Sequence, residues 1–339
     1  MTDRHQPHRA LDQDLEHLFE QTPLEAAGFP ERVALPPITG RAAGKFRDRI
    51  WLHVLLFLIT VGCTMLAGAG QYAAFATDFL ARPVEFTLPL FIRGLWYGAT
   101  ILLILGAHEF GHYFACRYYD VDASLPYFLP IPFGLTGTLG AFIRIREPIP
   151  SKRMLFDIGI AGPIAGFVLA VPALFLGIWM SRMVPLPPGF EGFSLGEPLL
   201  FKAASWLIWG PTPAGYSLNL HPVAFAAWFG LLATALNLFP IGQLDGGHVT
   251  YAVIGRHATK VTIAMLAVTL GLTFLSVSWI AWAVLLAIMV AAFGYRHPRT
   301  IDEHIPLDRK RLWLALFALI MFVLCFTPAP IQPTQFLGH

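Results

Sequence analysis

Three residues in the stretch Leu102–Tyr119 have the types and the spacing needed to bind and use a metal ion: His108, Glu109 and His112. Side chains four positions apart lie on one face of a helix, so His108 and His112 can present two imidazoles to a single ion. Glu109 lies about 100° further round the helix. There it is better placed to take a proton from a water molecule than to bind the metal. This H-E-x-x-H pattern indicates metal-assisted hydrolysis.

Other roles are open to the same residues. The two histidines could hold a haem, bind a structural metal or relay protons. Neither a haem site nor a proton relay explains a glutamate directly after the first histidine. The motif also lies in an apolar run that resembles a membrane span, where an ionisable residue is costly and marks a functional site by default.

The composition indicates a membrane protein. Of the 339 residues, 56% are hydrophobic and 13% are charged, whereas soluble domains carry about 25% charged residues. The net charge of +2 argues neither for nor against a nucleic-acid partner, no long basic run exists, and we expect no such partner. Cys63, Cys116 and Cys325 lie in apolar segments and form no C-x-x-C pair, so the histidine pair is the one obvious metal-binding nucleus.

We predict an all-α polytopic membrane protein with about seven transmembrane helices and a re-entrant β-hairpin-like loop. Seven apolar segments approach the length that spans a hydrocarbon core of about 30 Å. The fifth and sixth are separated only by the residues around Ser278, and they could instead be one long kinked helix. The segments lie near Ile50–Gly70, Leu95–Arg117, Leu155–Met180, Pro222–Gln243, Val261–Val277, Trp279–Phe293 and Leu312–Phe326.

The distribution of basic residues predicts the orientation, because Lys and Arg collect in cytoplasmic loops. With seven spans and the N-terminus inside, the outside loops hold only four basic residues: Arg82, Arg93, Arg182 and Lys202. Six spans would put the basic cluster between 296 and 311 outside. We expect residues 1–48 to be a cytoplasmic N-terminal segment and residues 49–339 to be the membrane domain, with its core at about 95–251.

The loop Pro126–Pro148 follows the motif and is mildly apolar but interrupted by Pro and Gly. Its segment Thr138–Arg146 has strand-like composition, and Gly134, Gly137 and Gly140 permit turns. A re-entrant hairpin fits, because non-helical backbone at membrane depth is tolerated where protein or a water-filled cavity covers it. An ordinary surface loop is the alternative.

A catalytic metal of this type needs a third protein ligand. Pro240, Gly242 and two further glycines make a continuous helix improbable near the end of the fourth apolar segment, and Asp245 lies in this broken region. The predicted topology puts Asp245 and the histidine pair near the same side of the membrane. Asp245 could instead be a helix N-cap. His248 is a rival ligand, whereas His221 is expected to lie at the opposite side.

The pattern His108-Glu109-x-x-His112, followed by Asn237-x-x-Pro240-x-x-x-Leu244-Asp245-Gly246, resembles the site-2 protease family of intramembrane zinc metalloproteases. The segment Leu155–Gly166, rich in small residues, is also typical of that family and would let helices pack closely. The resemblance implies one catalytic Zn²⁺ ion held by His108, His112 and Asp245, with Glu109 as general base. It also implies that Asn237 faces the substrate carbonyl, although a helix–helix hydrogen bond is an alternative role.

No PDZ-like insertion is evident, so the chain is most similar to the PDZ-free branch, which includes photosynthetic-organelle and cyanobacterial proteins. The implied function is hydrolysis of peptide bonds within or near the transmembrane segment of single-span membrane-protein substrates. A metal or proton-coupled transporter is the rival, because its broken helices and intramembrane charges look alike, but we find no internal repeat. We expect a multi-pass protein of a bacterial inner (plasma) membrane, in contact with the lipid bilayer and with its N-terminus in the cytoplasm.

Overall fold

The structure is a computed structural model that describes residues 45–79, 83–186, 192–294 and 297–333. Most of the expected N-terminal segment 1–48 therefore lies outside the described residues. The fold below is that of the unit that begins at Lys45.

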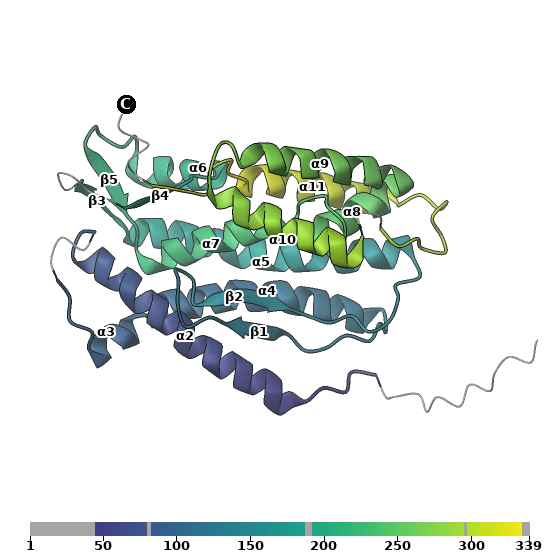
Figure 1. Cartoon of the computed structure of the whole chain (residues 1–339), viewed down its shortest axis with the longest axis horizontal. Helices are drawn as coiled ribbons and strands as arrows, with labels where there is room; N and C mark the ends of the chain where they lie inside the picture. The colour runs from purple at the N-terminus through teal and green to yellow at the C-terminus, as the bar shows by residue number, and fades with distance from the viewer. Residues whose placement is uncertain (1–44, 80–82, 187–191, 295–296, 334–339) are drawn as a thin grey trace, which may run out of the picture. The chain divides into compact units, whose positions relative to one another are not determined.

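Within the described ranges the chain is mostly helical (Figure 1). The helices are α2 (Ile50–Ala76), α3 (Leu88–Arg93), α4 (Leu95–Tyr118), α5 (Lys152–Met180), α6 (Leu199–Trp209), α7 (Pro222–Asn237), α8 (Asp245–Ile254), α9 (Ala258–Leu272), α10 (Ser278–Phe293) and α11 (Arg309–Cys325). The strands are β1 (Tyr127–Pro130), β2 (Thr138–Phe142), β3 (Arg182–Pro185), β4 (Phe193–Leu195), β5 (Tyr216–Asn219) and β6 (Ile331–Pro333). The strands form three antiparallel pairs: β1 with β2, β3 with β5, and β4 with β6.

Local sequence sets where several helices begin. The hydroxyl of Ser151 accepts a hydrogen bond from the backbone N–H of Arg153 and caps α5. Asp308 caps α11 by accepting from the backbone N–H of Arg311 at 3.1 Å. Pro222 is the first residue of α7, a position where its missing N–H leaves no hydrogen bond unmade. Each of these starts is followed by an apolar run that packs into the domain.

The centre of the domain is the packing of α5 against α4 and α7. Glycines let these backbones approach closely. A Cβ atom added at Gly111 of α4 would lie 2.6 Å from the carbonyl oxygen of Ala161, and one added at Gly177 of α5 would lie 2.2 Å from the backbone nitrogen of Ala224. The helices that carry the two sequence motifs are therefore held together by the small-residue helix between them.

Four helical stretches are long and apolar enough to cross a membrane: 50–76, 88–118, 152–180 and 245–272. The last is interrupted between α8 and α9 at Gly255, which has a φ of 57°. With the apolar composition, these stretches make the chain an integral membrane protein. Helix α7 has 16 residues, fewer than the roughly 20 that a straight span needs. Helices α9 and α10 are separate and pack against each other, so they are not the single kinked helix considered above.

The loop after α4 contains an antiparallel strand pair, as its composition predicts. Tyr127 of β1 lies opposite Phe142 of β2, and Phe128 lies opposite Ala141. Strand β2 itself ends at Phe142. The antiparallel pairing resumes beyond it, where Ala123 bridges Ile145 and the backbone N–H of Arg146 donates to the carbonyl oxygen of Asp122 at 2.8 Å, so paired backbone extends to the expected end at 146. Gly140 has a φ of 104°, a conformation that favours glycine and fits its place in this short, twisted pair.

This hairpin lies beside α2 and α4 (Figure 1). A Cβ atom at Gly137, near the tip, would lie 2.5 Å from the carbonyl oxygen of Cys63 in α2. Contacts with α2 continue from the base of the hairpin to its tip, through the pairs His53–Pro126 (hydrogen bond, 3.1 Å), Phe57–Phe128 (ring centroids 5.1 Å apart) and Gln71–Leu135 (hydrogen bond, 2.8 Å). Helix α2 therefore supports the hairpin over most of its length.

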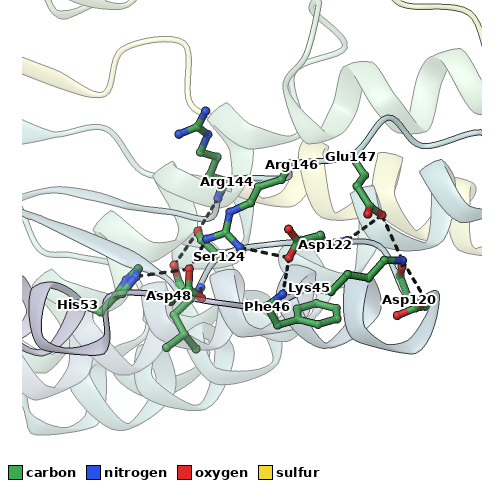
Figure 2. Close-up of polar contacts among 11 residues, drawn as sticks. Lys45, Phe46, Asp48, His53, Asp120, Asp122, Ser124, Arg144, Arg146 and Glu147 are labelled. Atoms are coloured by element: carbon green, nitrogen blue, oxygen red, sulfur yellow. Dashed lines mark hydrogen bonds and ion pairs between the residues drawn. The ribbon is translucent and has the colours of Figure 1, made fainter. Parts of the chain in front are cut away.

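A polar network at the base of the hairpin joins the segment before α2 to both arms (Figure 2). The side chain of Asp48 is 3% exposed, pairs with Arg146 and accepts a hydrogen bond from the backbone N–H of Leu125 at 2.9 Å. Asp122 pairs with the same arginine at 3.1 Å and accepts from the backbone N–H of Phe46 at 2.6 Å. The network fixes the base of both arms of the hairpin against the segment that precedes α2.

Candidate metal centre

Helix α4 places His108 and His112 one turn apart on the same face, as their spacing predicts. The two Nε2 atoms lie 3.1 Å apart, and both side chains are buried, with residue exposures of 6% and 7%. Glu109 is also buried, and its Oε1 lies 4.0 Å from the Nε2 of His108. The three residues therefore form a buried cluster of two potential ligands and a carboxylate beside them.

The break between α7 and α8 brings Asp245 to the histidines. Its Oδ2 lies 3.2 Å from the Nε2 of His108 and 3.2 Å from the Nε2 of His112. The turn is tight, because a Cβ atom at Gly246 would lie 2.0 Å from the carbonyl oxygen of Leu238. Asp245 is the first residue of α8 and Leu244 is its N-cap, so the alternative role of Asp245 as a cap is not seen.

The spacing of these three atoms fits a zinc ion. Ligand atoms about 2.0–2.1 Å from a tetrahedral Zn²⁺ lie about 3.3 Å from one another. The observed separations of 3.1, 3.2 and 3.2 Å form a nearly equilateral triangle close to that size. Two imidazole nitrogens and one carboxylate are also a donor set that catalytic zinc sites use. The residues present therefore fit the metal that the sequence led us to expect.

Helix α5 forms the wall behind the histidines. The Nδ1 atom of His112 donates a hydrogen bond to the carbonyl oxygen of Ile158 at 2.7 Å, which leaves Nε2 free to bind a metal. A Cβ atom at Gly162 would lie only 2.0 Å from that Nε2 atom, and one at Gly166 would lie 3.2 Å from the Cβ of His108. The glycines identified from the sequence as packing residues thus also leave room for the imidazoles.

The role of Ile158 is not visible in the sequence, because every residue type has a backbone carbonyl. One signal was present: Gly159, Gly162 and Gly166 recur at helical spacing in the span between the two motifs. Of these glycines, Gly162 and Gly166 face the histidines of α4, and Gly159 faces His248 of α8.

Asn237 is the last residue of α7, and its Nδ2 atom lies 3.3 Å from the Nε2 of His108. The amide is therefore part of the cluster rather than of a distant helix contact. A metal bound to the histidine would use the same nitrogen lone pair, and the amide would then be free to donate to another acceptor.

The two other histidines considered as ligands lie elsewhere. The Nδ1 of His248 is 2.7 Å from the Nε2 of His297, whose Nδ1 donates to the carbonyl oxygen of Pro298. Burial lowers the pKa of His297, which favours the neutral ring, and a neutral ring that donates from Nδ1 accepts at Nε2 from His248. The ring of His221 packs edge-on against Phe75 in the loop region at the other end of α7.

A cavity of about 300 Å³ adjoins the cluster. His108, Glu109 and Asn237 line it, together with Gly140 of β2 and Trp282 of α10. A substrate could therefore reach the carboxylate and the ligands through a space bounded by the hairpin and by α10.

Comparison with known proteins identifies related sequences. The family model described as "Peptidase family M50" matches residues 97–278, just over half of the chain. The probable zinc metalloprotease EGY2, chloroplastic, of Arabidopsis thaliana is 29% identical over 245 residues, which cover 72% of this chain and 43% of that protein. The EGY1 protein of Oryza sativa subsp. japonica, with the same description, is 30% identical over 231 residues, covering 62% of this chain and 39% of that protein.

A third relative, the probable zinc metalloprotease EGY3, chloroplastic, of Oryza sativa subsp. indica, is 31% identical over 262 residues, covering 71% of this chain and 42% of that protein. The chain thus spans less than half the length of these relatives. No solved structure matches the chain. The relatives are named as chloroplastic, so they give no support to the bacterial inner membrane expected from the sequence.

Proposed function

Because the chain belongs to peptidase family M50, the family of the site-2 proteases that its motifs resemble, we propose that it is an intramembrane zinc metalloprotease. It hydrolyses peptide bonds within or near the transmembrane segment of membrane-protein substrates. The observation that carries this proposal is the buried triangle of His108, His112 and Asp245, with Glu109 beside it at the edge of a cavity. Membership of a peptidase family favours this function over the metal or proton-coupled transporter.

His108, His112 and Asp245 are the residues that would hold zinc, and the names of the relatives support this choice of metal. When bound, zinc polarises the scissile carbonyl and lowers the pKa of a water molecule. The hydrogen bond from His112 to Ile158 keeps the Nε2 lone pair directed at the site.

Glu109 is the general base in this proposal. It lies next to the ligands without being one of them, and its carboxylate lines the cavity. It takes the proton of the attacking water and returns it to the leaving amine. Asn237 donates its amide N–H to the oxyanion that develops on the carbonyl, and loss of such a donor typically costs roughly 10²–10³ in rate.

We further propose that the chain crosses the membrane seven times. Contacts at each end of the helices support this number. The loops at 150 and 301 hydrogen-bond to each other near the starts of α5 and α11, whereas β3 pairs with β5, and β4 with β6, at the opposite end. The passes are α2, α4, α5, the broken α7–α8 segment, α9, α10 and α11, with the N-terminus in the cytoplasm.

The hairpin is re-entrant in this arrangement, because β1 lies along the membrane-spanning α2. Residues 49–339 form the protease domain, its core lies at about 95–251, and residues 1–48 are cytoplasmic. Substrates are single-span proteins whose helix unwinds at the depth of the site, since a helical peptide bond is shielded by its own hydrogen bonds.

The decisive experiment compares the full chain with its Glu109→Gln variant. Both proteins, purified in detergent and reconstituted in vesicles, are assayed for bound zinc and for cleavage of a single-span reporter. We expect about one zinc ion per chain in both, and cleavage only by the unmodified protein. Equal cleavage by both proteins, or an unmodified protein without zinc, would rule out this function.

A further inference from the structure

The cavity beside the metal centre has walls of two kinds. Near the cluster it is polar, with Glu109, His108 and Asn237. Away from the cluster it is apolar, and both strand β2 and helix α10 contribute to it. Strand β2 pairs only with β1 among the described strands, so its other edge is not covered by a third strand.

Helix α10 contributes two tryptophans that differ in role. Trp279 is 1% exposed, and its indole N–H donates to the carbonyl oxygen of Pro328 at 2.7 Å. It also packs against Phe239 and Phe326, so it belongs to the core. Trp282, one turn further along, is only half-buried and forms part of the cavity wall. Its ring therefore borders the space that a substrate would fill.

The wall contributed by α5 and α7 is formed by small residues. Gly166, Gly230 and Ala233 line the cavity. A Cβ atom at Gly230 would lie 2.9 Å from a methyl carbon of Ile104, so side-chain bulk is excluded there by packing. The small residues on these helices therefore leave room in the cavity, and Trp282 is one of the large side chains that bound it.

The apolar part of the cavity offers little to a polar group. Its polar side-chain groups outside the metal cluster are the hydroxyl of Thr234 and the indole N–H groups of Trp279 and Trp282. The hydroxyl of Thr234 already donates to the carbonyl oxygen of Gly230 at 2.9 Å, and the indole of Trp279 donates to that of Pro328. A charged side chain placed there would exchange its water for at most the indole N–H of Trp282, which is unfavourable. An apolar side chain would instead gain from burial.

We propose that Trp282 bounds a subsite for an apolar side chain of the substrate, on a residue next to the scissile bond, and limits the size of that side chain. The inference rests on the proposed protease function, because the same cavity contains Glu109 and the metal ligands. Trp282 acts as a specificity-determining residue and takes no part in the chemistry.

The test uses the zinc-loaded full chain and a set of single-span reporters. The reporters differ at one position, which is either the residue before or the residue after the cleaved bond, and this position carries Ala, Leu, Phe or Asp. Mass spectrometry locates the cleaved bond. The unmodified protein should cleave the Leu reporter at least about 100-fold more efficiently than the Asp reporter, in kcat/KM. No difference between these two reporters would overturn the subsite.

Substitutions at the wall then identify its residues. Trp282→Ala should raise the ratio of kcat/KM for Phe over Ala by about tenfold, within the range that a few methylene groups produce in an apolar pocket. Ala233→Leu should lower the same ratio by narrowing the cavity from α7. Trp313→Ala removes a tryptophan that is 70% exposed on α11, outside the cavity, and should leave the ratio unchanged.

The outcomes separate the two proposals. An unchanged Phe-to-Ala ratio in Trp282→Ala, or an equal fall for every reporter, would overturn the role of Trp282 while leaving the protease function intact. If Trp282→Ala does not fold, Ala233→Leu and Trp282→Phe decide the question by the same ratio. Failure of the protease function itself would appear differently, as no zinc-dependent cleavage of any reporter by the unmodified protein.

Discussion

The Nδ1 atom of His112 in α4 lies 2.7 Å from the carbonyl oxygen of Ile158 in α5, a residue 46 positions away. A carbonyl only accepts hydrogen bonds, so Nδ1 carries the hydrogen and Nε2 keeps its lone pair. Such a partner fixes both the tautomer and the orientation of a metal-binding imidazole. The proposed zinc site thus depends on how α5 packs as well as on the ligands themselves.

Substituting Gly162 with Ala should remove the metal. The added Cβ would lie 2.0 Å from the Nε2 of His112, so either the imidazole or the helix must move. We expect zinc affinity to fall by more than the roughly 10–100-fold typical of lost outer contacts. The matched control is Gly70→Ala in α2, where the new Cβ meets nothing within 4 Å. Equal zinc content in the two purified variants would contradict the proposed packing.

The ligand set can be tested one residue at a time. His108→Ala, His112→Ala and Asp245→Ala should each abolish stoichiometric zinc binding, because each removes one of three ligand atoms. His248→Ala should retain zinc, since the potential ligand atoms that lie together are those of His108, His112 and Asp245. Metal analysis after dialysis gives the answer. Full zinc occupancy in Asp245→Ala would show that Asp245 is not a ligand.

Removing Arg146 should destabilise the domain, because the carboxylate of Asp48 would stay buried without its ion-pair partner. We expect a loss of about 2–3 kcal/mol in unfolding free energy, below the usual cost of breaking a fully buried pair because Arg146 is partly exposed. Arg153→Ala, which removes an exposed arginine, is the control. Thermal unfolding in detergent measures both. Restoration of stability in the Arg146→Ala variant by adding Asp48→Asn would confirm the cause, and equal stability of the two arginine variants would contradict it.

Comparing two glycines separates the contribution of β2 to the substrate path from the effect of backbone strain on cleavage. Gly134 and Gly140 have φ values of 89° and 104°, and an added Cβ meets nothing within 4 Å at either position. Alanine at either position should lower the unfolding free energy by about 1–2 kcal/mol, the usual cost of a left-handed conformation for a residue with a Cβ atom. Only Gly140 lines the cavity, so only Gly140→Ala should slow reporter cleavage, by about tenfold. Equal cleavage rates would remove β2 from the substrate path.

Reporter fusions test the seven-span orientation. Fusions after Glu20 and after Ala258 should report the cytoplasm, and a fusion after Gly196 should report the opposite side, because the basic residues concentrate in the loops assigned to the inside. An external signal at Ala258 would show that the α7–α8 segment runs across the membrane in the opposite direction. It would then separate Asp245 from the histidines in the proposed topology.

Much of the site could be predicted from residue types at fixed spacing. The pair His108 and His112 requires only helical periodicity, and the glycines and proline around Asp245 predict a broken helix. The contact between these two segments, more than 130 positions apart, followed from the topology argument and from the family resemblance. The structure adds distances that residue types alone do not contain.

Other features could not be read from the sequence. The orientation of His112 depends on a backbone carbonyl at Ile158, which any residue could provide. The interruption of the hairpin pairing between Phe142 and Ile145, which forms a bridge with Ala123, is a register feature that the strand propensity of residues 138–146 does not contain. Likewise, the ion pair of Asp48 with Arg146 joins residues 98 positions apart in regions that composition describes only as polar.

The support of the hairpin by α2 links the cleft to the bilayer itself. Helix α2 is 27 residues long, and only 22% of its most apolar window is buried within the protein, so its exposed apolar side chains, among them Trp51, Leu55 and Leu58, are available to contact lipid. A helix with a long apolar run adapts to membrane thickness by tilting. Because the hairpin contacts α2 from His53 to Gln71, any such tilt displaces the strand beside Glu109. We therefore expect the width of the cavity to change with the thickness of the surrounding membrane.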